Sequence, residues 1–257
     1  MARRLLLSAS ATAAFALLLA LALLVPLAPP GLAKPRQAEA PRITPTPQEL
    51  EVTGSGDPVR GVVDLIVGEE VDAATLAEVE EALSRAGVRS IRRHGPDWRP
   101  RGAFIVTIGE PAETPAVTAA LDRLGVDGPQ GLPADGYVLA SGRSHTSTEI
   151  VLAGVDGDGT FYAAKTLAQL LDPADYEGPG RQRLPFVTIR DWPSMTLRGA
   201  IEGFYGTPWS HEQRLRQMDF YGDMKMNVYA YAPKDDPYHR ELWDVPYPPE
   251  ELARLGE

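Results

Sequence analysis

The sequence predicts an α+β domain that is followed by the truncated start of a β/α-barrel. Between residues 48 and 190, short apolar strands are interleaved with segments of helical periodicity, which is typical of a mixed layer structure. After residue 190, two short apolar strands each run directly into a loop rich in glycine, aromatic and charged residues. Loops of this kind are typical of the strand ends that form the reaction face of a TIM-type (β/α)8 barrel.

Seven segments of the first region have the pattern of a strand or a helix. Asp72 is expected to cap the first helix and Gly87 to end it, while Pro115 lies in the first turn of the second helix. The last two strands are separated by a short polar loop and are expected to form a hairpin. The expected strands are 61–67, 103–108, 137–140 and 149–153, and the expected helices are 72–86, 114–124 and 157–171.

The second region, residues 191–257, reads as a β-α-β-α unit. Strands are expected at 197–201 and 227–231, and Ser210 with Gln213 forms a capping box at the start of the helix between them. A further helix is expected from Pro249. A closed barrel needs eight strands, so this region accounts for only its beginning.

The N-terminus is predicted to be a secretory signal peptide, residues 1–33. A basic start at Arg3 and Arg4 precedes an almost wholly apolar stretch from 11 to 27, and a small-residue cleavage motif ends at Ala33. The alternative is a retained membrane anchor, because the apolar stretch is close to the shortest span that crosses a bilayer. We expect cleavage, a secreted protein without a stable membrane span, and a linker over residues 34–47.

Composition excludes some classes of partner and ligand. The formal net charge is −10 and no basic stripe is present, so nucleic acid is not an expected partner. The histidines lack metal-ligand spacing, and the turn from Asp156 to Thr160 lacks the glycine and glutamate that a calcium loop needs. We therefore expect neither a metal nor a cofactor.

The two strand-end loops carry the candidate chemistry. Gly203-Phe-Tyr-Gly206 places aromatic rings between glycines, where backbone can approach a ligand closely, and Lys234 follows the next strand. Aromatic faces and a lysine with three donors suit a sugar. The structural alternative is that the aromatic residues pack the barrel rim and that the neighbouring aspartates pair with Lys234.

The runs Arg198-Gly-Ala-Ile-Glu-Gly-Phe-Tyr-Gly-Thr-Pro-Trp-Ser-His211 and Ala232-Pro-Lys-Asp-Asp-Pro-Tyr-His-Arg240 closely resemble glycoside hydrolase family 84. This family contains β-N-acetylglucosaminidases, including O-GlcNAcases and enzymes once called hyaluronidases. The preceding region is similar to the α+β domain found before the barrel in families 20 and 84. The resemblance implies a hydrolase acting on glycans or glycoproteins that contain N-acetylglucosamine, and the expected signal peptide makes it a secreted one.

The resemblance also assigns roles by position. It places the family's sugar-binding glycine at Gly203 and the lysine that holds a sugar hydroxyl at Lys234, and Tyr205 is expected to line the same pocket. The family's retaining reaction is substrate-assisted: the 2-acetamido oxygen attacks the anomeric carbon and gives an oxazoline, and an Asp-Asp pair supplies orientation and acid–base catalysis. That pair belongs to a later strand of the family, and Asp235-Asp236 does not match it.

The sequence therefore predicts a family member that lacks its catalytic pair within these 257 residues and is inactive as written. Two alternatives remain at this point. The first alternative to a family 84 hydrolase is a non-catalytic glycan-binding or accessory module. The second is a relative of the family 20 β-hexosaminidases.

Overall fold

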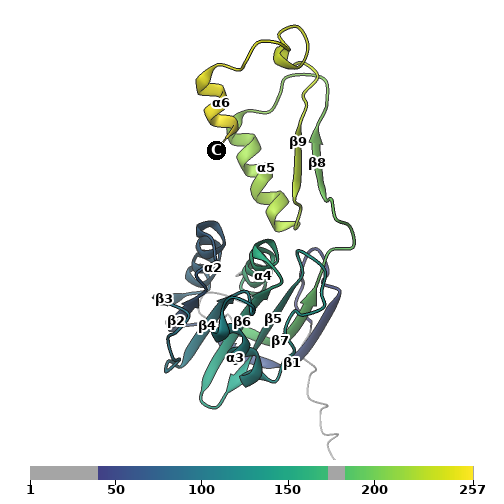
Figure 1. The fold of residues 1–257 in the computed structure, drawn as a ribbon. Coiled ribbons are helices and arrows are strands. Elements are labelled where there is room, and N and C mark those ends of the chain that lie inside the picture. Colours follow the sequence, from purple (N-terminus) through teal and green to yellow (C-terminus); the bar gives the residue numbers. More distant parts are fainter. Residues whose placement is uncertain (1–39, 173–182, 257) are drawn as a thin grey trace, which may run out of the picture. The chain divides into compact units, whose positions relative to one another are not determined.

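The computed structural model describes residues 40–172 and 183–256 (Figure 1). The expected signal peptide, residues 1–33, and residues 34–39 of the expected linker lie outside the described residues. Within the described ranges, no helix combines the length and the apolar character needed to cross a membrane.

The larger part of the described chain, which we call the sheet domain, is built on a seven-stranded mixed sheet in the order β1-β7-β5-β6-β4-β2-β3. Four neighbouring strands, β1, β7, β5 and β6, pair antiparallel, and β6, β4, β2 and β3 pair parallel. The strands are β1 (Glu49–Pro58), β2 (Gly61–Val67), β3 (Val88–His94), β4 (Phe104–Gly109), β5 (Tyr137–Ser144), β6 (Ser147–Gly154) and β7 (Arg183–Asp191).

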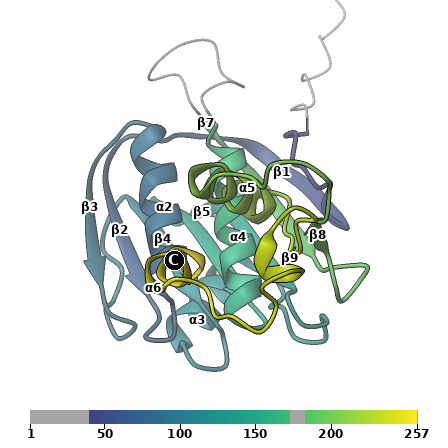
Figure 2. The same ribbon diagram turned by 90° about the horizontal axis from the view of Figure 1, so that it is seen from above.

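Helices cover both faces of this sheet. Helices α2 (Ala73–Arg85) and α4 (Gly157–Leu170) pack side by side on one face, and α3 (Pro115–Leu124) packs on the other (Figures 1 and 2). Each face has its own apolar core: Val79, Leu83 and Leu167 belong to the larger cluster, and Val117 and Leu121 to the smaller one. The three-layer arrangement explains why β4 reads as a continuous apolar run, because a strand between two helix layers is buried on both sides.

The hairpin prediction is confirmed. Strands β5 and β6 pair antiparallel from Tyr137 opposite Gly154 to Ser144 opposite Ser147. The turn between them contains His145, which has a left-handed φ of 52°. Both strands extend further toward this turn than the apolar pattern indicated. The residues next to the turn, at the end of β5 and the start of β6, are mostly polar and therefore lie outside the apolar runs.

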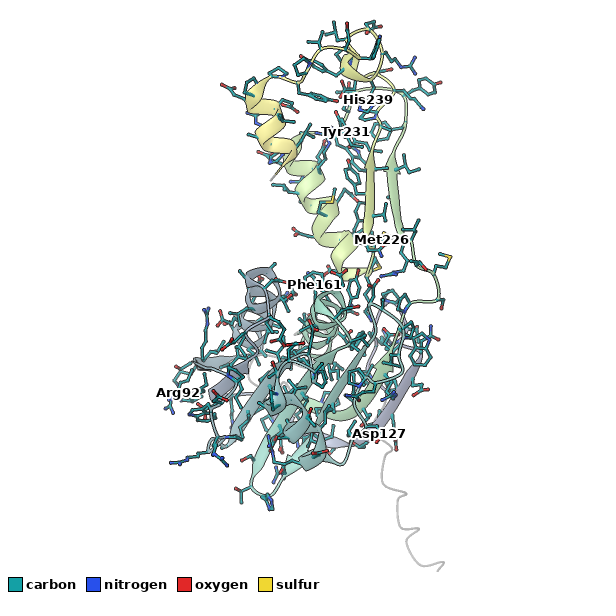
Figure 3. All side chains as sticks on the ribbon, in the orientation of Figure 1. Arg92, Asp127, Phe161, Met226, Tyr231 and His239 are labelled. Atoms are coloured by element: carbon teal, nitrogen blue, oxygen red, sulfur yellow. The ribbon has the colours of Figure 1, made fainter. Side chains whose placement is uncertain are left out.

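Strands β1, β3 and β7 have no counterpart among the strands expected from sequence, and the residues of β3 show why it was missed. In β3, only Val88, Ile91 and His94 are half-buried, and the exposed residues include three arginines, Arg89, Arg92 and Arg93; Arg92 is labelled in Figure 3. The strand lies at the edge of the sheet, where charged side chains are tolerated and discourage edge-to-edge association. The apolar periodicity on which the prediction relied is therefore weak here.

Helix α4 begins at a cap that also holds a neighbouring loop. The Oδ1 atom of Asp156 accepts a hydrogen bond from the Gly159 amide at 2.8 Å, and Oδ2 accepts one from the Asp135 amide at 2.9 Å. One carboxylate thus satisfies a free N–H of the helix and fixes the loop two residues before β5.

We predict that Asp156→Ala lowers the free energy of unfolding by about 1.5 kcal/mol, because it removes the helix cap and a loop contact together. Chemical denaturation followed by circular dichroism measures this. Asp158→Ala is the matched control: Asp158 is an exposed acidic residue in the same turn, and its removal is expected to change stability by less than about 0.5 kcal/mol. Equal effects of the two variants would contradict the capping role.

The remaining part of the chain, residues 198–256, is called the strand-pair segment. Its strands β8 (Gly199–Glu202) and β9 (Val228–Tyr231) form a separate parallel sheet, and α5 (His211–Asp223) connects them. After β9 come a 3-10 turn, η2 (Pro237–His239), and α6 (Pro249–Leu255). The predicted β-α-β-α order of this region is confirmed.

Candidate functional site

The loops that follow β8 and β9 lie side by side. The Lys234 amide donates to the Phe204 carbonyl at 3.0 Å, and the Gly206 amide donates to Oδ2 of Asp235 at 2.8 Å. The two motifs singled out in the sequence are therefore joined by hydrogen bonds at the carboxyl ends of two parallel strands. This is the edge at which α/β proteins place their ligands.

The strand pair has one covered face and one open face. Glu202 and Tyr229 point toward α5, where both side chains contact residues of the helix or each other. Ile201, which alternates with Glu202, has a 72% exposed side chain on the other face. A Cβ atom on Gly203 would lie 3.2 Å from Cγ2 of Ile201, so a larger residue would crowd Ile201 here, and Gly203 itself is half-buried.

Lys234 has no ion pair within the described ranges, and its side chain is half-buried. The neighbouring aspartates do not neutralise it. Asp235 accepts from Gly206, and Asp236 accepts from two tyrosine hydroxyls and the Tyr238 amide. The structural alternative, in which these aspartates pair with Lys234, is wrong, and the ammonium group keeps its donors for another acceptor.

Tyr205 lies away from any enclosed surface, because its side chain is 78% exposed. Its neighbour Phe204 is 36% exposed and contacts the Trp209 ring at 5.4 Å between centroids. The structure therefore brings Gly203 and Lys234 together and leaves Tyr205 open to solvent on the same loop.

A buried carboxylate supports the β8 end. Glu202 accepts hydrogen bonds from Nε and Nη2 of Arg214 on α5 at 2.8 and 3.1 Å, from the Trp209 amide at 2.9 Å, and from the Tyr229 hydroxyl. Burial by itself raises the pKa of Glu202, but the bonds from Arg214, Tyr229 and Trp209 hold it below its ordinary value. A bidentate pair with satisfied lone pairs is the geometry in which a buried ion pair is retained.

A second buried carboxylate supports the β9 end. Asp236 accepts from the hydroxyls of Tyr231 and Tyr247 and from the Tyr238 amide, and these bonds outweigh burial and lower its pKa. Burial and the bond to Asp236 raise the pKa of Tyr247 to about 12. Tyr231 also packs edge-on against His239 at 5.4 Å between ring centroids, a contact visible in Figure 3.

The two carboxylates are linked through one side chain. The Arg214 guanidinium that binds Glu202 also lies over the Tyr231 ring, 4.6 Å from its centroid, a favourable cation–π geometry. The network therefore runs from the end of β8 through α5 to the end of β9. Sequence reasoning missed Glu202 and Arg214; the available signal was a charged residue inside a short apolar strand, which needs a partner when buried.

Within the described residues, no group of three or more histidine and acidic side chains has an arrangement that would hold a metal ion.

Two protein-family models match this chain. The β-N-acetylglucosaminidase family model matches residues 198–257, and the model for glycosyl hydrolase family 20, domain 2, matches residues 40–192. The second match covers more than half of the chain, so the sheet domain belongs to that domain family.

Two solved structures cover both regions together. CpGH84D is 30% identical with a TM-score of 0.70 over 84% of this chain, and CpGH84B is 33% identical with a TM-score of 0.64 over 83%. The chain is similar to the N-terminal portion of proteins of the glycoside hydrolase family 84 type. The family 84 resemblance predicted from the two motifs is thus confirmed, and so is the similarity of the preceding region to families 20 and 84.

The chain also matches curated proteins over a short stretch. It is 46% identical to protein O-GlcNAcase of Rattus norvegicus, and equally to that of Mus musculus, over 59 residues, which are 23% of this chain. Those residues span only 6% of the curated relatives, and the chain spans 34% of each of the two CpGH84 structures.

We predict that Glu202→Gln lowers the free energy of unfolding by about 3 kcal/mol, because it leaves the Arg214 guanidinium without its carboxylate. Urea denaturation measures the change. Glu212→Gln is the matched control, since Glu212 is an exposed residue of the same helix as Arg214. A loss at Glu202 no larger than that at Glu212 would contradict the role of the ion pair.

The lowered pKa of Glu202 also predicts how stability depends on acid. A carboxyl whose pKa is lower in the folded state stabilises the fold above its ordinary pKa of 4.5, and this contribution is lost as the pH falls through the lower, folded-state pKa. Glu202→Gln is therefore expected to flatten the decline in stability between about pH 5 and pH 3. Denaturation midpoints of both proteins across this pH range measure the decline. The same dependence of stability on pH in Glu202→Gln and in the parent would contradict the prediction.

Proposed function

We propose that this chain contributes the sugar-binding edge of a secreted β-N-acetylglucosaminidase that acts on terminal or protein-linked N-acetylglucosamine. The observation that carries the proposal is the position of Lys234, which is half-buried, has no ion pair among the described residues, and donates from its amide to the carbonyl of Phe204, the residue after Gly203. The motif similarity to protein O-GlcNAcase and the CpGH84 structures supports the choice of sugar.

The chemistry of the two residues suits the first sugar of a glycan. An ammonium group without a carboxylate partner has donors to offer to hydroxyl oxygens, and a charged hydrogen bond of this kind is worth about 1.5–3 kcal/mol. Gly203 has no side chain of its own at this strand end, so a ring can contact its backbone there, next to the exposed Ile201.

The open face of β8 and β9 supports the proposal that these are the first two strands of a TIM barrel. Parallel strands are normally buried on both faces, whereas here Ile201 and Val228 are 72% and 40% exposed. A two-stranded sheet also has little stability of its own. Further strands closing beside this pair would cover that face and place Gly203 and Lys234 at the mouth of the barrel.

The acid–base step is proposed to use carboxylates outside these residues. In the substrate-assisted reaction implied by the family, the acetamido oxygen attacks the anomeric carbon while an Asp-Asp pair orients and protonates. Asp235 and Asp236 are engaged in holding the loops, which supports reading them as structural. We propose that an Asp-Asp pair at a later strand end completes the site and that this chain alone does not hydrolyse the sugar.

We predict that N-acetylglucosamine binds weakly to the chain and that Lys234→Ala weakens binding about tenfold. Ligand-observed NMR titration measures the affinity. Arg240→Ala is the matched control, because Arg240 is an exposed cation a few residues further along the same loop and is expected to leave the affinity unchanged. Equal affinity of the Lys234 variant and the parent would refute the assigned role.

The chain is expected to release no chromophore from an aryl N-acetylglucosaminide. Turnover by pure protein would overturn the proposal that the acid–base pair lies elsewhere. The companion measurement is to extend the reading frame past residue 257 and look for an Asp-Asp pair at a strand end, and its absence in every frame would count against the same proposal.

A further inference from the structure

The chain segment between α5 and β9 is anchored inside the sheet domain by a buried lysine. Lys225 donates from Nζ to Oδ2 of Asp191 at 2.7 Å and to the Tyr137 hydroxyl at 2.8 Å. Tyr137 in turn contacts Oδ2 of Asp191 at 3.0 Å and the Thr166 hydroxyl at 2.6 Å. Lys225 and Asp191 are each only 7% exposed, so the two charges are satisfied by each other and by Tyr137.

The backbone at Lys225 indicates that its side chain is needed. Its φ is 55°, a left-handed conformation that L-residues other than glycine, asparagine and aspartate rarely adopt and that costs of order 1–3 kcal/mol. Glycine would adopt this turn without strain. A lysine in its place is explained by the ion pair that its side chain makes with Asp191.

The start of β8 is anchored beside it. Nη2 of Arg198 donates to Oδ2 of Asp135 at 2.7 Å and to the Tyr162 hydroxyl at 3.3 Å, while Nε donates to the Lys225 carbonyl at 2.8 Å. The loop before β5 and the residue before β8 are thereby joined. Asp135 is itself held by the cap of α4 through Asp156.

A third side chain connects the two strand starts to each other. Asn227 accepts the Arg198 amide at Oδ1 at 3.0 Å, and its Nδ2 donates to the Thr196 carbonyl at 2.9 Å. Its own amide donates to the Arg198 carbonyl at 2.8 Å. The pairing that follows begins at Gly199 opposite Val228, directly after these anchored residues.

Apolar packing completes this contact between the sheet domain and α5. A Cβ atom on Gly222 of α5 would lie 3.4 Å from Cζ of Phe161 on α4, so the two helices approach closely at this glycine. The Tyr162 hydroxyl donates to the Met226 carbonyl at 3.4 Å, and Figure 3 shows Phe161 and Met226 near each other at the junction.

We propose that the sheet domain sets the register of β8 against β9, with Lys225 and Arg198 as positioning residues for the Gly203–Lys234 site. The anchors hold the starts of both strands, and the register then runs through four pairs, from Gly199–Val228 to Glu202–Tyr231. Gly203 and the loop of Lys234 follow immediately, so their juxtaposition depends on this register. The link to sugar binding rests on the proposed function, whereas the register does not.

The physical reason is the weakness of a short strand pair. Two strands of four residues make few hydrogen bonds, and a pair with an open apolar face has alternative registers of similar energy. A slip of two residues keeps the same side chains on each face and would be the least costly error. Buried polar contacts that are satisfied in one alignment only discriminate between registers more strongly than apolar contacts do.

The chain contains no cysteine, so engineered cysteine pairs report the register directly. Ile201→Cys with Ala230→Cys joins residues that are opposite in the observed register, and Ile201→Cys with Val228→Cys joins residues that face each other only after a two-residue slip. Mild oxidation and mass spectrometry measure the disulfide yield of each pair. In the parent chain the first pair is expected to dominate.

Lys225→Met removes the ammonium group and keeps the length of the side chain. The preference for the observed register is expected to fall about tenfold in this background. Lys165→Met is the matched control, because Lys165 is another buried lysine with two carboxylate partners, Glu78 and Asp223, but it does not contact either strand start. The control is expected to keep the parent preference even if its overall stability falls.

Amide exchange of β4 and β6 shows whether each variant keeps the seven-stranded sheet. If Lys225→Met does not fold, the disulfide yields are measured in Asp191→Asn, which removes the partner charge with little change in volume. An unchanged preference in a folded Lys225 or Asp191 variant overturns the proposal, and so does an equal fall in the Lys165 control. No sugar is present, so this outcome is independent of a failed N-acetylglucosamine titration.

Discussion

The ion pair between Lys225 and Asp191 is the interaction on which the arrangement of this chain depends. It joins the end of β7 to the turn that precedes β9, and both side chains are largely buried. Burial lowers the pKa of Lys225, and the charge of Asp191 opposes that shift. Oδ2 of Asp191 binds Lys225 and Tyr137, and its Oδ1 accepts the amides of Gln48 and Trp192. The carboxylate is therefore fixed within the sheet domain, and its ion pair with Lys225 ties the strand-pair segment to it.

Two further buried carboxylates, Glu202 and Asp236, stabilise the opposite ends of the same strands. Glu202 holds α5 through Arg214, and Asp236 holds the loop after β9 through two tyrosines. Each strand is thus held at its start by the sheet domain and at its end by its own loops and helix. Lys234, whose ammonium has no partner within the described ranges, lies at the end of this supported framework. The hydrogen-bond partners of a charged residue, and not its residue type, therefore distinguish the structural carboxylates from the candidate ligand-binding lysine.

Local pattern was sufficient for most of the fold. The apolar runs of β2, β4 and β6, the capping residues Asp72 and Ser210, and the Pro115 start of α3 all appear in the structure near the expected positions. Strand β3 was missed because an edge strand carries charges where a central strand carries apolar residues. The pairing of β7 between β1 and β5 also follows from no local signal, since strand order depends on contacts between distant residues.

The sequence by itself determined the family, the order of the elements and the two loops that carry the candidate sugar contacts, because these reside in contiguous motifs. Only the tertiary structure decided how Asp235, Asp236 and Lys234 divide their roles, since adjacent residues in a loop point to different partners. It also decided that Lys225 is an anchor, because its partner Asp191 is 34 residues away in sequence. The free energy of a buried charge depends on the partners around it in the folded protein. These partners can be distant in sequence, so periodicity along the chain does not identify them.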